Sequence, residues 1–263
     1  MTAANYIKQL LSFEEYSFSL VELQGETAKS KTSIRSELSR LTEKKEILNL
    51  RKGFYLIIPP RYSRQSQLPI QLYINKLFKN LNRKYYLGFY SAAKFQGASH
   101  QQIQRDYVIT EKPKLKDIVK NGFDLRFFTT TKWPEKNILE KKSDAGIFKI
   151  SSPALTVVDL IHHQTKLGGL SRMMAIIEEL SEEINQNDIA ELLTWYPHKS
   201  TLQRFGFLLE ELQVDKSLCV KILKHLQQFR YFPVLLSPKP DKKAGAVNNP
   251  WKVDVNIELE SDL

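Results

Sequence analysis

Two short stretches near the start of the chain carry side chains that could contact DNA. The first is a helical segment whose polar residues lie along one side, namely Lys31, Thr32, Arg35, Ser36, Ser39 and Arg40. The second is the basic turn Arg51-Lys52-Gly53 between two apolar runs. We expect Arg35 to read a base edge, because its planar guanidinium can make two hydrogen bonds to guanine. We expect Lys31, Arg40 and the cations of the turn to contact phosphates.

Three helices and a β-ribbon are expected to position these side chains. The apolar spacing predicts helices over residues 3–12, 20–24 and about 30–45, and strands over residues 47–50 and 54–58. Ser19 is the expected N-cap of the second helix, and Gly25 is expected to end it. Ser30 or Thr32 is expected to cap the third helix. The narrow buried stripe of that helix consists of Ile34, Leu38 and Leu41.

This order of elements is typical of a winged helix-turn-helix domain, whose recognition helix contacts base edges with its first residues. We therefore predict a DNA-binding domain of this kind over residues 1–60. Two alternatives remain open. A polar helix face can simply be solvated, and helix-turn-helix shapes also serve as protein-binding modules.

The basic charge of the chain lies mostly outside this first domain. The 263 residues carry a net charge of +10. Residues 1–60 hold nine bases and seven acids, residues 61–150 eighteen bases and seven acids, and residues 151–263 twelve bases and fifteen acids. The middle segment could offer a basic face to DNA, to an acidic partner or to RNA, or could only keep the protein soluble. The lysines proposed for that face are Lys112, Lys114, Lys116, Lys120 and Lys132.

The remaining residues, 61–263, are predicted to form a larger α+β domain. Its first part, residues 61–150, is mixed and basic, and its second part, residues 151–263, is mainly helical. Helices are expected over residues 68–81 and 153–162, and strands over residues 107–110, 125–131, 147–150 and 253–259. From residue 170 the pattern predicts a helical bundle, with joints at residues 185–187, 197–198 and 214–215.

Four motifs, in order along the chain, resemble one protein family. The first closes the predicted ribbon with Gly53, Phe54, Tyr55, Pro59 and Pro60. The second consists of Tyr86, Gly88, Ser91, Ala92, Ala93, Gly97, His100 and Gln101. The last two contain Pro153, Asp159, Gly168, Gly169 and Leu170. In this order the motifs resemble the AbiEi-type antitoxins of type IV toxin–antitoxin systems, which act in abortive infection and phage defence.

The resemblance implies a protein in two parts. The winged helix-turn-helix would bind operator DNA and repress the protein's own operon. The larger part would neutralise a nucleotidyltransferase-like toxin encoded beside it, by direct contact or by indirect antagonism. The residues alone leave a different regulator open, in which the second domain senses a ligand or dimerises.

We expect no catalytic residues, no metal site and no cofactor. His162 and His163 are adjacent, so on a helix they point about 100° apart, and His100, His198 and His225 are expected to stand alone. A nuclease-like set is imaginable from Asp106, Glu111 and Lys112, but its spacing is generic.

The aromatic residues and the cysteine are assigned to packing. Tyr85, Tyr86, Phe89 and Tyr90 could stack on bases, but their spacing fits a core better. The single cysteine, Cys219, lies in an apolar helical pattern. No apolar run approaches the roughly 20 residues of a membrane span, and we read no signal peptide, so a cytoplasmic protein is expected.

Overall fold

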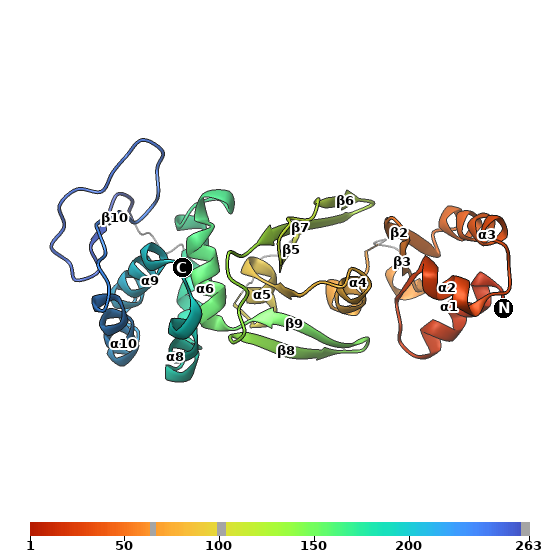
Figure 1. Cartoon of the computed structure of the whole chain (residues 1–263), viewed down its shortest axis with the longest axis horizontal. Helices are drawn as coiled ribbons and strands as arrows, with labels where there is room; N and C mark the ends of the chain where they lie inside the picture. Colours follow the sequence, from red (N-terminus) through yellow and green to blue (C-terminus); the bar gives the residue numbers. More distant parts are fainter. Residues whose placement is uncertain (64–66, 99–103, 259–263) are drawn as a thin grey trace. The chain divides into compact units, whose positions relative to one another are not determined.

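The computed structural model describes residues 1–63, 67–98 and 104–258 of a mixed α+β protein (Figure 1). The chain divides into two compact units, and each is made of three segments. The first unit consists of Met1–Tyr86, Gln104–Thr130 and Glu140–Lys149, and the second of Leu87–Ile103, Thr131–Leu139 and Ile150–Leu263. No helix in the described ranges is both long and apolar enough to span a membrane.

The first sixty residues form three helices and a small sheet. The elements are α1 (Ala3–Ser12), β1 (Ser17–Ser19), α2 (Leu20–Glu26), α3 (Lys31–Glu43), β2 (Ile47–Arg51) and β3 (Phe54–Ile57). The strands pair in the order β1-β3-β2, and both pairings are antiparallel. The three predicted helices and the ribbon are confirmed, and β1 is an addition.

Local signals explain where these helices begin. The Ser30 hydroxyl accepts a hydrogen bond from the backbone N–H of Ser33 at 3.2 Å, so Ser30 rather than Thr32 caps α3. The Ser19 and Glu22 side chains form a reciprocal capping box at the start of α2. The prediction that Gly25 ends α2 is wrong, because the helix continues through Glu26.

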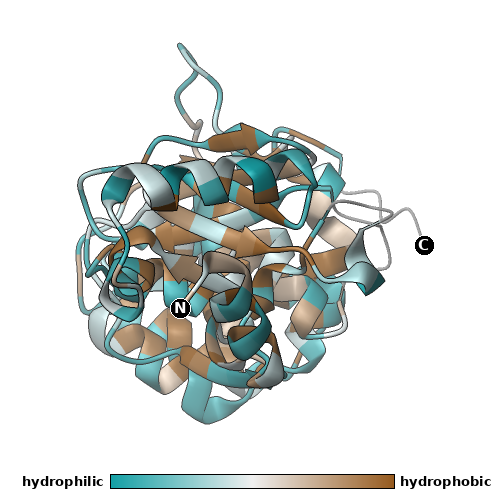
Figure 2. Ribbon diagram, turned by 90° about the vertical axis from the view of Figure 1, so that its right-hand side faces the viewer, coloured by the Kyte–Doolittle hydropathy of each residue, from teal (hydrophilic) through white to brown (hydrophobic). Residues whose placement is uncertain are grey.

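A hydrophobic core joins these helices to the sheet. The predicted stripe of α3 is buried in it, together with residues of α1, β1 and α2 such as Leu10, Phe18 and Leu23. In Figure 2, hydrophobic and hydrophilic positions alternate along the helices, as expected for amphipathic elements. Burial of one face leaves the opposite face of α3 in solvent.

A larger sheet follows, and most of its residues belong to the first unit. Before it come a 3₁₀ turn (Ile70–Leu72) and α4 (Ile74–Asn80). The strands are β4 (Tyr85–Leu87), β5 (Asp106–Thr110), β6 (Ile118–Lys120), β7 (Phe123–Thr129), β8 (Ile138–Ser143) and β9 (Gly146–Ser151). Their order is β6-β7-β5-β4-β9-β8, with β5 parallel and β6 antiparallel to β7.

The predicted elements of this segment are only partly correct. One helix over residues 68–81 is wrong, because Tyr73, at φ −139°, separates the 3₁₀ turn from α4. The three predicted strands lie at β5, β7 and β9. Strands β4, β6 and β8 were not predicted, because the first two have three residues each and β8 exposes most of its side chains.

The second unit is mainly helical. Its helices are α5 (Phe89–Phe95), α6 (Pro153–His162), α7 (Met174–Glu182), α8 (Gln186–Trp195), α9 (Lys199–Glu211) and α10 (Lys216–Gln227). Helix α6 packs against α5, α7, α8 and α9, and its residues 154–161 are all buried. The helix over residues 153–162 and the joints at residues 197–198 and 214–215 are confirmed. The joint at residues 185–187 is only partly correct, because Gln186 and Asn187 already belong to α8.

A polar network fixes the start of α6. The Asn137 amide donates to the backbone and carboxylate oxygens of Asp188, at 2.9 and 2.7 Å. Asp188 also accepts from the backbone N–H of Ala154, and Trp195 donates to Asn137, each at 2.8 Å. All four residues are buried. Their hydrogen bonds satisfy one another, as buried polar groups require.

The end of the described chain is held on α9. Strands β10 (Val234–Leu235) and β11 (Val253–Asp254) pair in parallel, and the Trp251 ring packs against Gly206 of α9. A Cβ at Gly206 would lie 2.0 Å from the Trp251 ring, so only glycine allows this approach. The predicted strand over residues 253–259 is only partly correct, because it begins at Val253 but ends at Asp254. Residue 259 lies outside the described residues.

Candidate nucleic-acid interface

Helix α3 presents the six predicted side chains on one exposed surface. Lys31, Thr32, Arg35, Ser36, Ser39 and Arg40 are all exposed. The apolar stripe on the opposite side is buried, with between 1% and 8% of each side chain exposed. The polar residues form two rows at four-residue spacing, one beginning at Lys31 and the other at Thr32. The helix can therefore offer cations and hydroxyls to a ligand without disturbing the core.

Glu37, one of the two acids of α3, is tied back to the protein. The Glu37 carboxylate accepts a hydrogen bond from the backbone N–H of Ala3 at 2.8 Å and forms an ion pair with Lys29. The Lys29 hydrogen bond, followed by the Ala3 bond, holds the pKa of Glu37 below its usual range. Ser39 donates to Glu43 at 3.2 Å. The negative charge of Glu37 is thus compensated beside the exposed rows.

The β-ribbon differs from its prediction at the turn. Arg51 is the last residue of β2, pairs with Phe54 and is half-buried, so the turn consists of Lys52 and Gly53 alone. Gly53 has φ +76°, a conformation that favours glycine. Its carbonyl accepts from the backbone N–H of Leu20 at 2.8 Å. The turn is therefore short and held against the start of α2, with Lys52 exposed at its tip.

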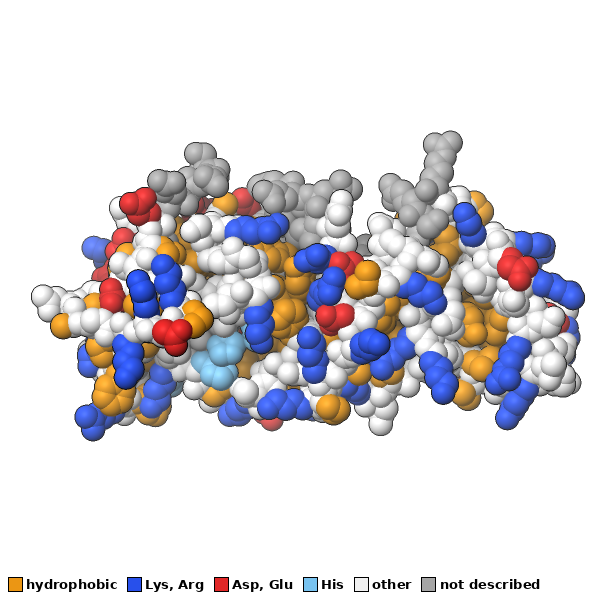
Figure 3. Space-filling model, turned by 90° about the horizontal axis from the view of Figure 1, so that it is seen from above, with side chains coloured by type: hydrophobic (Ala, Val, Ile, Leu, Met, Phe, Trp, Pro, Cys, Tyr) orange, Lys and Arg blue, Asp and Glu red, His pale blue; other side chains and the backbone are white. Residues whose placement is uncertain are grey.

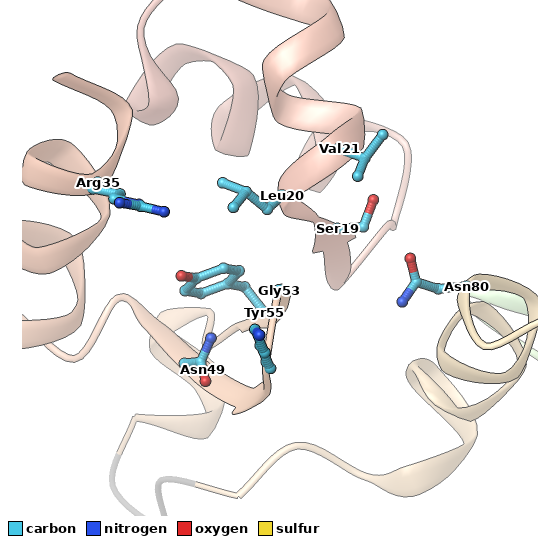
Figure 4. Close-up of a pocket in the computed structure, with 9 residues that line it drawn as sticks. Ser19, Leu20, Val21, Arg35, Asn49, Gly53, Tyr55 and Asn80 are labelled. Carbon is cyan, nitrogen blue, oxygen red and sulfur yellow. The ribbon is translucent and has the colours of Figure 1, made fainter. Parts of the chain in front are cut away.

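An open pocket of about 670 Å³ lies between α3, the ribbon and the start of α2. Figure 4 shows the Arg35 side chain extending from α3 toward Leu20 and Tyr55. The lining residues are Ser19, Leu20, Val21, Arg35, Asn49, Lys52, Gly53, Tyr55 and Asn80. A guanidinium, an ammonium group, a phenol and two amides can together hold a phosphate or a base edge.

Sequence reasoning missed the neutral members of this pocket. Asn49 of β2 and Tyr55 of β3 are cross-strand partners. Because opposite residues of an antiparallel pair share a face, the predicted ribbon could have identified them. The Tyr55 ring also stacks on Phe18, with centroids 5.4 Å apart. Asn80 comes from α4 and could not have been found from the ribbon.

The five predicted basic-face lysines do not fall in one unit. Four of them, Lys112, Lys114, Lys116 and Lys120, are exposed in the first unit, whereas Lys132 belongs to the second. Lys120 donates to the backbone carbonyl of Asn49 at 2.9 Å, which places it beside the ribbon. Figure 3 shows Lys and Arg side chains spread over the face in view, with acidic side chains between some of them.

The nuclease-like set is not assembled. Asp106 begins β5, and Glu111 follows its last residue, so the two carboxylates lie at opposite ends of the strand, roughly 16 Å apart along the chain. Glu111 accepts a hydrogen bond from the backbone N–H of Lys84 at 3.0 Å. Lys112 is exposed. These residues do not converge on a reacting atom.

His198 does not stand alone, contrary to the prediction. Its ring stacks on His162 with centroids 4.1 Å apart, and His162 lies 4.7 Å from His163. The Thr201 hydroxyl is hydrogen-bonded to His162 Nδ1, and the Thr131 hydroxyl to His198 Nε2. Each oxygen–nitrogen distance is 3.1 Å. Burial is the main cause that lowers the pKa of His162 to about 4 and that of His163 to about 3. The pair is therefore neutral near pH 7.

Within the described residues, no group of three or more His, Cys, Asp or Glu side chains is arranged to hold a metal ion.

Two further predictions of packing are confirmed. Tyr85, Tyr86, Phe89 and Tyr90 are buried, and Cys219 is buried as well. Burial raises the pKa of the Cys219 thiol. His100, like Gln101, lies outside the described residues.

Comparison with known proteins finds a similar family for the middle of the chain. Residues 86–211 match the family model of the AbiEi antitoxin C-terminal domain. No curated protein matches the chain. The matched span contains α5 to α9, including the buried helix α6, and it does not include α3 or the ribbon. These 126 of the 263 residues are therefore similar to the antitoxin domain of the AbiEi family.

Proposed function

We propose that this protein is the antitoxin of a type IV toxin–antitoxin system and represses its own operon by binding operator DNA. The match of residues 86–211 to the antitoxin domain carries the proposal. In this proposal, residues 61–263 neutralise a nucleotidyltransferase-like toxin. Residues 1–60 act as a winged helix-turn-helix in the cytoplasm and need no cofactor.

The exposed surface of α3 supports the DNA-binding part. Lys31 and Arg35 lie one turn apart near the start of α3, where a recognition helix reaches base edges. We assign Arg35 to a guanine and Lys31 to a phosphate. The pocket beside Arg35 adds Tyr55 and Asn49 as further hydrogen-bonding groups.

In this proposal the ribbon makes fewer DNA contacts than an extended wing would make. A two-residue turn held against Leu20 cannot reach far along a groove. We assign a phosphate contact to Lys52, which is exposed, and a lesser contribution to Arg51, which is half-buried. Lys120 lies beside the ribbon and could add a further phosphate contact.

The test separates the two activities in the full chain. Growth is measured in cells that express the neighbouring open reading frame, alone and with this protein, and operator binding is measured by gel shift. We expect growth arrest that the wild-type chain relieves. Lys31→Ala with Arg35→Ala should abolish operator binding and still relieve arrest, because neither substitution touches residues 86–211.

A matched control removes two charges elsewhere in the first domain. Lys8→Ala with Lys44→Ala alters exposed lysines away from the first turns of α3 and should leave both activities intact. Normal operator binding by the Lys31 and Arg35 double variant would show that α3 is not the recognition helix. Arrest that persists with the wild-type chain would favour a regulator whose second domain senses a ligand or dimerises.

A further inference from the structure

The charge of the second unit is divided between two segments of opposite sign. Residues 178–191, from α7 to α8, contain six acids and no bases. Residues 216–252, from α10 to the loop before β11, contain eight bases and one acid. The small net charge of residues 151–263 hides this division. The later segment is therefore a strongly basic surface in a unit that is otherwise acidic.

Exposed aromatic rings accompany this basic charge. Phe229 is 41% exposed and Phe232 is 61% exposed, at the turn that follows α10. Each ring has a cation over it: Lys199 Nζ is 4.3 Å from the Phe229 centroid, and the Arg230 guanidinium carbon is 5.0 Å from that of Phe232. Lys252 lies 4.5 Å from the Tyr231 centroid. We call these six residues the aromatic–basic surface.

Contacts with α9 hold the segment that carries the two phenylalanines. Lys199, over Phe229, is the first residue of α9. Gln203, one turn later, donates to the backbone carbonyl of Phe232 at 2.9 Å. The segment from Phe229 to Phe232 therefore contacts two residues of α9 that lie one helical turn apart. The same Gln203 amide donates to the Trp251 carbonyl at 2.8 Å, which anchors the following loop.

We propose that the aromatic–basic surface binds single-stranded nucleic acid. Exposed rings stack on unpaired bases, and neighbouring lysines and arginines contact the phosphates between them. Bases have flat faces that stack on exposed rings, whereas an acidic protein segment would require only the cations. On the left of Figure 3, where α10 lies, Lys and Arg side chains lie next to hydrophobic ones.

This surface is separate from the proposed operator contact. Its rings lie beyond residue 211, where the family match ends, and α3 belongs to the other unit. The proposal therefore does not rest on DNA binding by α3. The rings are exposed, so their substitution is not expected to disturb the core.

The experiment measures binding of the full chain to a fluorescent oligo(U) of about 16 nucleotides. We expect Phe229→Ala with Phe232→Ala to weaken binding about thirtyfold, because two stacking contacts are lost. Phe229→Trp with Phe232→Trp should bind at least as well as the wild type. Arg230→Ala and Lys252→Ala should each lower the salt slope by roughly 0.7.

Two controls make the result specific. Phe13→Ala removes a phenylalanine that is 69% exposed in the first unit and should leave oligo(U) binding unchanged. Lys31→Ala with Arg35→Ala should also leave it unchanged while operator binding is lost. The proposal would be overturned if the wild type did not bind oligo(U), or if substitution of Phe229 and Phe232 left the affinity unchanged. Equal competition by polyglutamate would overturn it in favour of an acidic protein partner.

Discussion

Helices α3 and α6 begin in the same way, but α3 is exposed along one side whereas α6 is buried. Each has a serine N-cap, Ser30 or Ser152, whose hydroxyl accepts from the backbone N–H three residues later. Helix α3 then buries three residues and exposes its polar rows, whereas α6 buries eight residues in succession. The comparison teaches that a capping signal locates a helix, while the pattern that follows decides whether the helix contacts a partner or supports the fold.

The largest expected effect tests the supporting role of α6. Leu160→Ala removes a fully buried side chain and should lower the free energy of unfolding of the second unit by about 3 kcal/mol, through lost contacts and a cavity. Unfolding in urea can be followed by tryptophan fluorescence, because Trp133, Trp195 and Trp251 all lie in the second unit.

The matched change on α3 is Ser36→Ala. Ser36 is exposed, so its substitution should alter the free energy of unfolding by no more than about 0.5 kcal/mol. Comparable destabilisation by the two substitutions would mean that α3 supports the fold as much as α6 does.

The next prediction sharpens the role of Arg35 within α3. Arg35→Lys keeps the positive charge but cannot make two parallel hydrogen bonds to guanine. Under the proposed function, operator affinity should fall by about 2 kcal/mol while its salt dependence stays unchanged. Fluorescence anisotropy at several salt concentrations measures both. An unaltered affinity together with a reduced salt slope would instead assign Arg35 to a phosphate.

Local patterns in the sequence predicted both helices, because caps and apolar spacing act over a few residues. Ser30 and the stripe of α3 lie within twelve residues of one another, and Ser152 stands directly before Pro153. The joints at residues 197–198 and 214–215 were predictable for the same reason. These features require no knowledge of which distant segments pack together.

Features that depend on distant pairing were missed. Strand β1 has only three residues, SFS, and exists because it pairs with β3. Residues 253–259 alternate like a strand, but pairing with Val234–Leu235 supports only Val253–Asp254. The stack of His162 on His198 likewise joins residues 36 positions apart. Such contacts arise from tertiary packing, which a local pattern does not encode.

The histidine stack gives the second unit a dependence on pH. In the unfolded chain the pKa of His163 lies near its ordinary value of 6.5, whereas in the fold burial lowers it to about 3. Between these values the unfolded chain binds more protons, so stability falls as the pH falls below 6.5. We expect a loss of about 1 kcal/mol per pH unit from this half-buried histidine.

Tryptophan fluorescence in urea at pH 7 and pH 5.5 measures that slope. His163→Gln should reduce it, and His162→Gln should reduce it less, because His162 is more exposed. A slope that neither variant changes would mean that other groups control acid stability in the second unit.

The last prediction concerns an ion pair of α3 whose loss should have a small effect. Glu37→Gln removes the ion pair with Lys29. Because the Glu37 and Lys29 side chains are 23% and 32% exposed, the free energy of unfolding at pH 7 should fall by less than about 1 kcal/mol. The folded-state pKa of Glu37 is lowered, so its contribution is present above the unfolded value of 4.5 and is lost as the pH falls through the folded pKa. Hydrogen exchange of α3 amides should therefore distinguish variant from wild type at pH 7 and progressively less below pH 4.5. A difference that persists unchanged at the lower pH would assign the effect to packing of the Glu37 side chain against α1, and the charge on this helix would then be unimportant for its stability.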